Sequence, residues 1–453
     1  MTRFGMDGLL EREAAGAIVL LAALPFLFLH ERYQPTLVVD AGSTSVDLRL
    51  SDAAVVLVLL GALVAARRAK SRLRPALFLW LSGALLLGWL AFEAFRPASV
   101  DDDLFSDHLV SGAKLVEYSL LAPAVPLLVR SVVDLVLFLA GLVLWAGLAT
   151  AIALVQFFGV DIFGAWNPGW RQPSFLGHHD LAALAAIATS VATVGILVTR
   201  RRLPAVELFA VALGAGALGL VVAGSVAAAA GLALGAVALM LATRRRFAPS
   251  PRRLLAVVAL VLVVAGGVAA VRGDALEDFL RFVGVRGDEP PVGVETYSQR
   301  TVLAYIGLRI FADHPLIGVG WQRSSRPESF EPYLQDAHRR FPDVVDLAFP
   351  SAEHPWGVQN LYVQMLADAG VVGLALLFLV GVAGLVLVWR TLAHASTPWA
   401  VGAGLVPLCA LLTIAAEWAS LGIVAGIPLQ AAVSLLLGLA AAGAATVEDE
   451  TSV

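Results

Sequence analysis

The sequence predicts an all-α integral membrane protein with about twelve transmembrane helices and one large external loop between the ninth and tenth helices. Hydrophobic residues make up 59% of its 453 residues, and charged residues make up only 15%. The mean hydropathy is +0.83. A soluble chain carries about a quarter charged residues. The apolar residues also fall in runs of about 17 to 25, the length that crosses the hydrocarbon core of a bilayer.

The chain shows twelve such runs in order, and we expect each to be one span. The predicted spans lie near residues 14–29, 53–66, 75–95, 108–129, 133–158, 180–199, 205–223, 226–243, 254–271, 361–389, 399–418 and 421–445. The fourth is the least regular, because it contains Lys114, Glu117 and two prolines. The first is followed by polar residues without a small-residue cleavage site, which indicates an uncleaved span rather than a signal peptide.

Basic residues in short loops predict the orientation of these spans. Clusters at 67–74, 200–202 and 244–253 fall on one side when the spans alternate, and so do Arg130 and Arg390. The excess of Arg marks that side as the cytoplasm, so we expect a multi-pass protein of the cytoplasmic membrane with both termini inside the cell.

Composition also narrows the classes of function. A net charge of −4 gives no indication of nucleic-acid binding. A single cysteine, Cys409, excludes a disulfide framework or a thiolate metal cluster, and its apolar neighbours predict a small buried side chain. We find no internal repeat and no separate soluble domain, so residues 1–453 are expected to form one polytopic membrane domain.

Three longer segments are predicted to face outward. Residues 30–52 form a polar loop, and residues 159–179 form a second one. Residues 272–360 form a large extracytoplasmic loop, and loops of that length are usually functional rather than mere connectors.

The spacing predicts a helix over residues 300–315 of the large loop. Arg300 and Arg309 are nine residues apart, so they lie on opposite faces of that helix. Arg309 has Asp313 four residues on, a position suited to an ion pair, whereas Arg300 has no such local partner. Arg300 is therefore the better functional candidate, and the alternative is an anchor at the membrane interface.

His314 returns to within about 40° of the face that carries Arg300. It precedes Pro315, however, which favours a role in ending the helix over a catalytic one.

A polar stripe opens the tenth span. Asn360, Gln364 and Asp368 follow at intervals of four residues and share one helical face. Asp368 lies about two turns into an apolar run, where an ionisable group is a functional candidate by default. The alternative is a packing hydrogen bond to a neighbouring span. Gly370 and Gly373 permit close helix approach.

The outer segment at 166–180 adds Arg171, His178, His179 and Asp180. Asp180 suits the N-terminal cap of the sixth span. Adjacent histidines on a helix point about 100° apart, so the pair is a weak metal signal and we expect no metal site. Outer aromatic residues favour either the membrane interface or stacking on sugar rings. They are Trp166, Trp170, Trp321, Tyr333, Trp356 and Tyr362.

Three stretches together resemble the O-antigen ligase and O-antigen polymerase family of bacterial envelope glycosyltransferases. The first is R-T-V-L-A-Y-I-G-L-R-I-F-A-D-H-P-L-I-G-V-G at 300–320, and the second is Q-N-L-Y-V-Q-M-L-A-D-A-G-V-V-G-L at 359–374. The third, R-Q-P-S-F-L-G-H-H-D-L-A-A-L at 171–184, is similar to a shorter family motif. The resemblance covers roughly residues 165–385.

The resemblance implies glycosyl transfer at the outer face of the bacterial cytoplasmic membrane. The donor would be a glycan on a polyprenyl pyrophosphate, and the acceptor a glycan, a lipid core sugar or a protein, with no nucleotide sugar, metal or other cofactor. Arginine would stabilise the leaving pyrophosphate, because its planar fork matches phosphate oxygens. We carry that role to Arg300 first and to Arg171 second, with Arg309 as a third candidate. Gln364, Asn360, His179, Asp180, Trp321 and Trp356 are the expected substrate-binding residues.

The sequence departs from the family pattern at one position of the second motif. The family's usual His is Gln359, which cannot act as a base and is expected to bind or orient substrate, and the usual Glu is Asp368. Candidate replacements for the base are His314, His354, His179 and Asp368, and the loss also fits an inactive relative. Ligase and polymerase share these motifs, and neither the sugar, the acceptor nor the oligomeric state follows from them.

Two other classes compete with this interpretation. A twelve-span transporter or lipid-linked glycan flippase usually shows internal repeats and broken helices near the membrane midplane. Here the polar residues gather at the outer face instead. A peptidoglycan-type polymerase also has many spans and a long external loop, but the motif spacing does not support it.

Overall fold

The computed structural model describes residues 15–41, 44–198, 206–282 and 296–451. The helices of its main bundle are α2 (Ala15–Leu27), α3 (Leu50–Ala69), α4 (Leu77–Ala94), α6 (Phe105–Ser119), α7 (Leu121–Leu128), α8 (Val132–Phe157), α9 (His178–Val198), α10 (Val206–Ala223), α11 (Val226–Phe247), α12 (Pro251–Val271), α16 (Leu361–His394), α17 (Pro398–Glu417) and α18 (Pro428–Thr451). Shorter elements are α5 (Pro97–Val100), α13 (Gly273–Phe282), α14 (Thr296–Asp313), α15 (Pro327–Arg340), the strands β1 (Thr36–Ala41) and β2 (Thr44–Arg49), and the 3-10 turns η1 (Glu31–Tyr33), η2 (Lys70–Ala76), η3 (Arg323–Ser325), η4 (Asp346–Ala348) and η5 (Trp418–Ser420).

Eight helical segments of the described residues are long and apolar enough to cross a membrane. They are Leu50–Ala94, Val132–Phe157, His178–Val198, Val226–Arg244, Pro251–Val271, Leu361–His394, Trp399–Ser420 and Pro428–Asp449. The first contains both α3 and α4, and two shorter apolar helices are Gly16–Leu27 and Phe209–Ala223. The chain is therefore a helical, multi-pass membrane protein. Each predicted span falls on a helix or a helix pair, while the number of membrane crossings stays a prediction.

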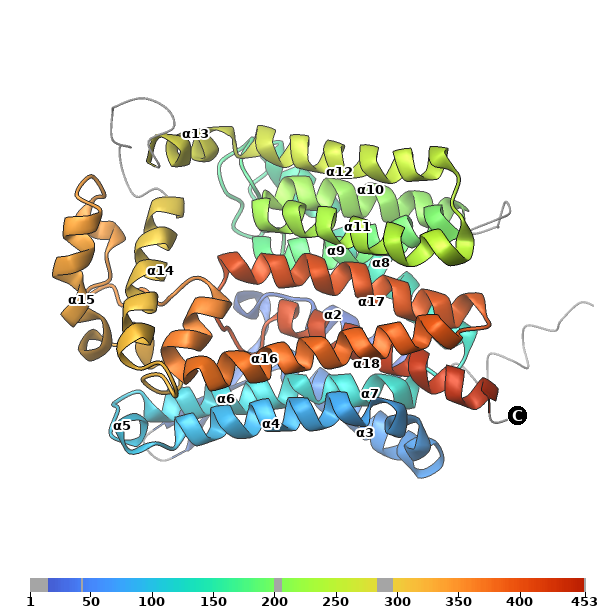
Figure 1. The fold of residues 1–453 in the computed structure, drawn as a ribbon, viewed down its shortest axis with the longest axis horizontal. Helices are drawn as coiled ribbons and strands as arrows, with labels where there is room; N and C mark the ends of the chain where they lie inside the picture. Colours follow the sequence, from blue (N-terminus) through green and yellow to red (C-terminus); the bar gives the residue numbers. More distant parts are fainter. Residues whose placement is uncertain (1–14, 42–43, 199–205, 283–295, 452–453) are drawn as a thin grey trace, which may run out of the picture.

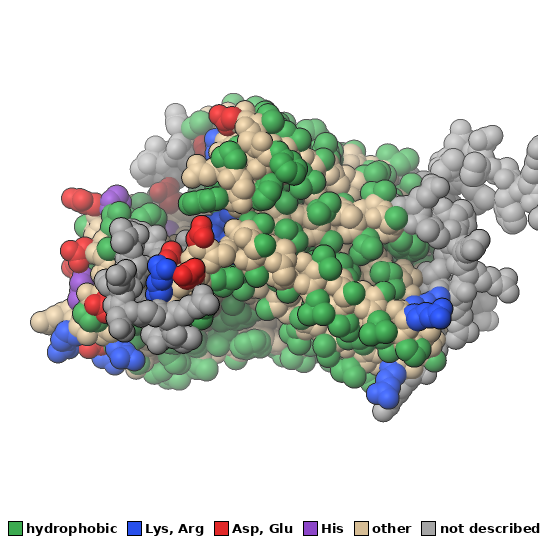
Figure 2. Space-filling view, turned by 90° about the horizontal axis from the view of Figure 1, so that it is seen from above, with side chains coloured by type: hydrophobic (Ala, Val, Ile, Leu, Met, Phe, Trp, Pro, Cys, Tyr) green, Lys and Arg blue, Asp and Glu red, His purple; other side chains and the backbone are tan. Residues whose placement is uncertain are grey.

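The bundle helices lie side by side, and α13, α14 and α15 lie together at one end of them (Figure 1). The C-terminal end of α18 and the α3–α4 and α11–α12 connections lie at the opposite end. Hydrophobic side chains cover the broad middle of the face shown in Figure 2, and charged side chains gather toward its two ends. That distribution suits a chain whose middle lies in hydrocarbon.

Helix α9 is the centre of the bundle. It packs against α8, α10, α11, α17 and α18, and its side chains are buried almost all round. A helix that is apolar on every side has no face for water and is stable only inside a larger assembly of helices. Its many alanines let neighbouring backbones approach closely. The N-terminal end of α9 is thus held in a fixed position by the whole bundle.

The fourth predicted span is broken into α6 and α7. Leu120 lies between the two helices, and its amide bonds to the carbonyls of Val116 and Glu117. Pro123 has no N–H to donate to the carbonyl of Ser119, four residues earlier, so the regular helical ladder is interrupted there. The last predicted span also begins later than expected, at Pro428 instead of residue 421.

The segment at 30–52 is not simply a polar loop, as the sequence analysis expected. Strands β1 and β2 pair antiparallel, with Thr36 opposite Arg49. Thr36, Val38 and Val39 lie in β1 and Thr44 and Val46 in β2, and such β-branched side chains favour a pleated surface. The hairpin is a small exception to an otherwise helical chain.

The large loop at 272–360 contains helices of its own. The helix predicted at 300–315 is α14, and its buried face packs against α15 and α16. Val302, Ile306 and Ile310 form a small hydrophobic core with Phe330 and Phe349. This separate core makes the segment from α14 to η4 a packed layer at one end of the bundle helices.

The orientation was predicted partly from residues that lie outside the described part of the chain. Arg200, Arg201, Arg202 and both chain termini lie outside the described residues. Arg72 of the first basic cluster is buried, donates to the carbonyl of Pro126 at 3.0 Å and pairs with Asp449 of α18. One of the charges on which the predicted orientation rests therefore also joins two parts of the bundle. The inward placement of both termini stays a prediction.

Candidate functional site

A cavity of about 430 Å³ lies where α14 meets the ends of α9, α11 and α17. We call it the arginine cavity. Its lining residues are Arg171, His178, His179, Gly224, Ser225, Val226, Ala227, Ala230, Tyr297, Arg300, Thr301, Ala304, Gln359, Asn360, Ala419 and Ser420. Five of the predicted site residues are among them, namely Arg171, His179, Arg300, Gln359 and Asn360. The lining contains two arginines and two histidines but no carboxylate among the residues that the structure describes.

Arg300 enters the cavity from the first turns of α14. The buried side chains of Val302, Leu303 and Ile306 fix the rotation of this helix, so the opposite side of α14 faces the cavity. Its Nε donates to Oε1 of Gln359 at 3.1 Å. The glutamine at the family's histidine position thus orients an arginine, a role that an uncharged amide oxygen can perform.

Arg171 reaches the same cavity from the loop before α9. Gln172 is fully buried and organises that loop, accepting from the amide of Trp166 at 2.8 Å and donating to the carbonyl of Asn167 at 2.9 Å. The guanidinium carbon of Arg171 lies 4.8 Å from the centre of the Trp166 ring, a cation–π contact. The ring leaves the hydrogen-bond donors in the guanidinium plane available to other partners.

Arg272 lies beside the cavity, directly after α12. Its guanidinium carbon is 5.4 Å from the centre of the Tyr297 ring, and its Nε is buried without a hydrogen-bond partner among the described residues. Gly224 makes this approach feasible, because a Cβ there would lie 2.7 Å from Cβ of Arg171 and 3.3 Å from Cδ of Arg272. Gly224 also has φ +62°, a conformation that favours glycine.

The three arginines act on one another electrostatically. Burial, together with the nearby charges of Arg272 and Arg300, lowers the pKa of Arg171 to about 10. Arg171 is still protonated at neutral pH, because its pKa stays well above 7. Three like charges gathered in a partly buried site are stabilised by an anion, and a pyrophosphate carries the charge and the acceptor oxygens to fill that role.

His179 stands at the other side of the cavity lining, in the first turn of α9. Its Nδ1 is hydrogen-bonded to Oε1 of Glu417, the last residue of α17. The second oxygen of Glu417 accepts from the hydroxyl of Ser225, the N-cap of α11. The ring of His178 lies against that of His179, with centroids 4.0 Å apart. The sequence predicted that the two rings would point about 100° apart, and that prediction is wrong. His178 is the first residue of α9, so no preceding helical turn limits its side chain.

Asn360 serves mainly as the cap of α16. Its Oδ1 accepts from the amides of Tyr362 and Val363 at 3.0 and 3.1 Å, and its Nδ2 donates to the carbonyl of Ala419 at 3.0 Å. It therefore fixes the segment that carries Gln359 and also joins it to the end of α17.

Asp368 and Gln364 lie outside the arginine cavity, and we call them, with Gly370, the anchor. Asp368 is fully buried; its Oδ1 accepts from the amide of Ser324 at 2.8 Å, and its Oδ2 accepts from Nε2 of Gln364 at 3.1 Å. Oε1 of Gln364 accepts from the amide of Ile423 at 2.6 Å. These bonds hold two loops against α16.

Gly370 interrupts α16 with φ +65° and ψ −169°. A Cβ there would lie 2.2 Å from the carbonyl oxygen of Leu316, so only glycine lets this loop come so close. The sequence analysis expected close approach of another helix at this position, and the structure places a loop there instead.

Two candidates on α14 and just after it are also outside the cavity. Arg309 is half-exposed on the far side of α14, and its Nε lies 3.6 Å from Oδ2 of Asp336 on α15. The predicted pairing with Asp313 is wrong, because Asp313 accepts from the hydroxyl of Tyr333 at 2.6 Å. His314 is exposed and follows the last residue of α14, and its carbonyl accepts from the amide of Gly318 at 3.0 Å.

The remaining candidates serve packing or lie at the surface. Trp321 is buried, and its Nε1 donates to the carbonyl of His108 at 3.1 Å. Trp356 is exposed and stacks on His354, outside the cavity lining. Asp180 was expected to cap its own helix, but its Oδ1 accepts from the amide of Leu429 in the first turn of α18 at 2.8 Å.

Sequence reasoning missed Glu417, Ser225, Arg272 and Tyr297 as parts of this site. Glu417 carried a usable signal, because a carboxylate at the end of an apolar run is a functional candidate by default. Arg272 follows the last residue of a predicted span, and an arginine at that position is equally consistent with an anchor at the membrane interface. Ser225 and Tyr297 carried no distinctive signal, since the cavity gathers them from distant parts of the chain.

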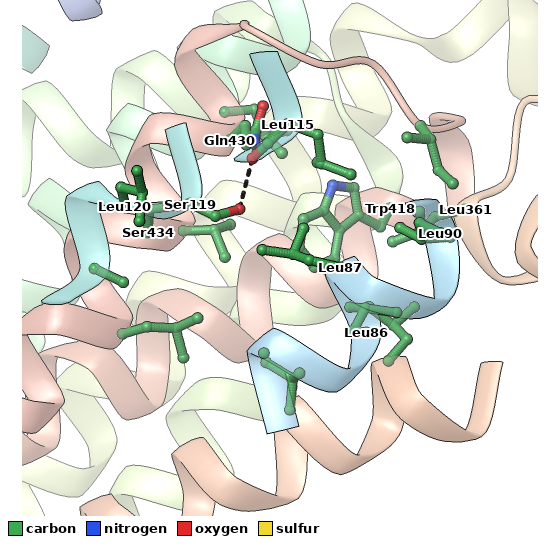
Figure 3. A pocket seen from close by; sticks show the side chains of 18 of the residues that line it. Leu86, Leu87, Leu90, Leu115, Ser119, Leu120, Leu361, Trp418, Gln430 and Ser434 are labelled. Atoms are coloured by element: carbon green, nitrogen blue, oxygen red, sulfur yellow. Dashed lines mark hydrogen bonds between the residues drawn. The ribbon is translucent and has the colours of Figure 1, made fainter. Parts of the chain in front are cut away.

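An apolar slot of about 380 Å³ lies next to the arginine cavity (Figure 3). Its lining on α4 runs from Leu79 to Leu90, about 17 Å at 1.5 Å per residue. Trp418 and Leu361 line the slot, whereas their chain neighbours Ala419 and Asn360 line the arginine cavity. The start of α16 and the turn η5 therefore border both spaces.

A family model described as O-antigen ligase matches residues 208–379 of this chain. The matched stretch contains Arg272, Arg300 and Gln359, while Arg171, His179 and Glu417 lie outside it. No curated protein matches the sequence. The matched stretch includes α14, whose Arg300 lines the cavity, and the part of α16 up to residue 379. This stretch of the multi-pass membrane protein is therefore similar to the O-antigen ligase family.

Proposed function

We propose that the protein transfers glycan from a polyprenyl-pyrophosphate-linked donor to an acceptor at the outer face of the bacterial cytoplasmic membrane. The similarity of residues 208–379 to the O-antigen ligase family supports a glycosyltransferase-like activity of the ligase or polymerase type. The observation that carries the finer proposal is the gathering of Arg171, Arg272 and Arg300 around one partly buried cavity.

The charges of the site suit the leaving group of this reaction. Breaking the bond between an anomeric carbon and a pyrophosphate leaves negative charge on the phosphate oxygens. Arg300 and Arg171 face the cavity, and the buried Nε of Arg272 lacks a partner among the described residues. Guanidinium groups fixed before the reaction stabilise that charge at little cost in reorganisation.

The apolar slot supplies a place for the lipid part of the donor. It is lined mostly by leucine, valine and alanine side chains on α4, α16 and α18, and it borders the arginine cavity at Leu361 and Trp418. An isoprenoid chain in the slot would leave its pyrophosphate at the cavity. Two of its polar side chains are already bonded, since Ser119 and Gln430 both donate to the carbonyl of Leu115.

The test is transfer by the purified protein in lipid nanodiscs, supplied with a polyprenyl-pyrophosphate oligosaccharide and neither nucleotide sugar nor metal. Release of polyprenyl pyrophosphate with a ladder of longer lipid-linked glycans would identify a polymerase. Release with one glycan on an added acceptor would identify a ligase. Movement of intact donor across a vesicle membrane, without release, would contradict the proposal and favour a flippase.

A further inference from the structure

His179 is held by a buried carboxylate that is itself fully bonded. Glu417 is 1% exposed, and its two oxygens contact different elements, with Nδ1 of His179 on one and the hydroxyl of Ser225 on the other. Ser225 is fixed in turn, because its Oγ accepts from the amide of Ala228 in the first turn of α11 at 3.1 Å. The three side chains connect the ends of α9, α11 and α17.

This arrangement determines which nitrogen of His179 carries the proton. An ionised carboxylate only accepts hydrogen bonds, so Nδ1 must donate to Glu417. In the neutral ring the lone pair then lies on Nε2, which has no hydrogen-bond partner within the described part of the chain. A histidine oriented by a carboxylate, with its other nitrogen available, is the arrangement of a general base.

The neighbours of His179 hold its ring in place. His178 lies against it at 4.0 Å between centroids, and Trp166 lies 5.1 Å from His178. The same Trp166 ring contacts Arg171, so the loop before α9 supports an arginine and the histidine pair together.

The geometry points to His179 as the general base that takes the proton from the acceptor hydroxyl, with Glu417 as the residue that positions it. This inference rests on the proposed glycosyl transfer. The acceptor oxygen forms a bond to the anomeric carbon as the bond from that carbon to the pyrophosphate oxygen breaks. The hydroxyl proton moves to Nε2 of His179, and the bonding electrons leave with the pyrophosphate, which the arginines bind.

The other candidate bases do not meet the same conditions. Gln359 lines the cavity but cannot take up a proton. Asp368 has both oxygens occupied by Ser324 and Gln364, away from the cavity lining. His314 and His354 are exposed and do not line the cavity. His178 lines it, but its Nε2 is buried.

The experiment compares His179→Ala, Glu417→Gln and the control His394→Ala in nanodiscs. His394 is exposed at the far end of α16, where its Nδ1 contacts the carbonyl of Arg390. Binding is measured with polyprenyl pyrophosphate alone, and transfer with lipid-linked glycan isolated from the protein's own cells. We expect His179→Ala and Glu417→Gln to bind the pyrophosphate within about twofold of wild type and to lower kcat by about 10²- to 10⁴-fold. The control should match wild type in both.

Added imidazole separates a chemical role from a structural one. It should restore part of the transfer in His179→Ala and none in Glu417→Gln, whose own imidazole still occupies the position. Wild-type transfer in His179→Ala, or equal losses of binding and transfer, would overturn the assignment of the base. A wild-type protein that neither binds polyprenyl pyrophosphate nor transfers glycan would instead contradict the proposed function. Measuring whether the wild-type protein binds polyprenyl pyrophosphate therefore tells a failure of the proposed function from a failure of the His179 assignment.

Discussion

The arginine cavity and the anchor look alike in the sequence but differ in what their polar atoms contact. Both regions place charged or amide side chains beside apolar helical segments. Asp368 and Gln364 of the anchor have carboxylate and amide atoms bonded to Ser324, to Ile423 and to each other. Beside the cavity, Arg272 keeps a buried donor without a partner among the described residues, and Arg171 in the lining lies close to two further positive charges.

The hydrogen-bond partners of a buried polar side chain indicate whether it serves the fold or a ligand. A side chain whose hydrogen-bonding atoms are all satisfied by the protein contributes to the fold, whereas one that lacks partners or faces like charge is suited to a ligand.

Replacing Arg300 should give the largest loss of activity with little change in stability. Arg300→Ala removes a guanidinium aimed at the leaving pyrophosphate, and losing one preorganised donor of this kind costs about 10²- to 10³-fold in rate. Glycan transfer in nanodiscs measures the loss, and thermal unfolding should be close to wild type. Arg309→Ala is the matched control, since Arg309 lies on the other side of the same helix, outside the cavity lining. Equal losses from the two variants would contradict the cavity assignment.

Replacing Asp368 should lower the stability of the protein more than its affinity for the donor, the opposite of the effect expected for Arg300. Asp368→Ala leaves the buried amide of Ser324 and Nε2 of Gln364 without acceptors, which costs about 2 kcal/mol of folding stability. The thermal unfolding temperature of the purified protein should fall. Affinity for polyprenyl pyrophosphate, measured on the folded fraction, should change less than in Arg300→Ala. A variant of unchanged stability that had lost all transfer would place Asp368 in the chemistry.

Replacing Gln359 should give the smallest effect. Gln359→Ala removes one hydrogen bond that orients Arg300 but leaves the charge in the cavity, so we expect a loss of about tenfold, near 1.4 kcal/mol. The ratio kcat/KM for the lipid-linked donor is the measurement. A loss larger than that of Arg300→Ala would show that the position carries an essential contact of its own.

Much of the fold followed from local pattern. The twelve apolar runs each became a helix or a helix pair, and the helix at 300–315 turned its apolar side inward as its spacing predicted. Such patterns are readable because a helix repeats every 3.6 residues and a bilayer has a fixed thickness. The hairpin at 36–49 and the break between α6 and α7 were missed, since short polar segments and paired prolines allow several local structures.

The sequence by itself determined a helical membrane protein, its family resemblance and the opposite faces of Arg300 and Arg309. Only the tertiary structure decided that Arg171, Arg300, His179 and Gln359 line one cavity while Asp368 does not. Only the tertiary structure joined Glu417 to His179, across 238 positions of the chain. The physical reason is that periodicity fixes which way a side chain faces on its own helix, whereas the partner that it meets depends on how distant helices pack.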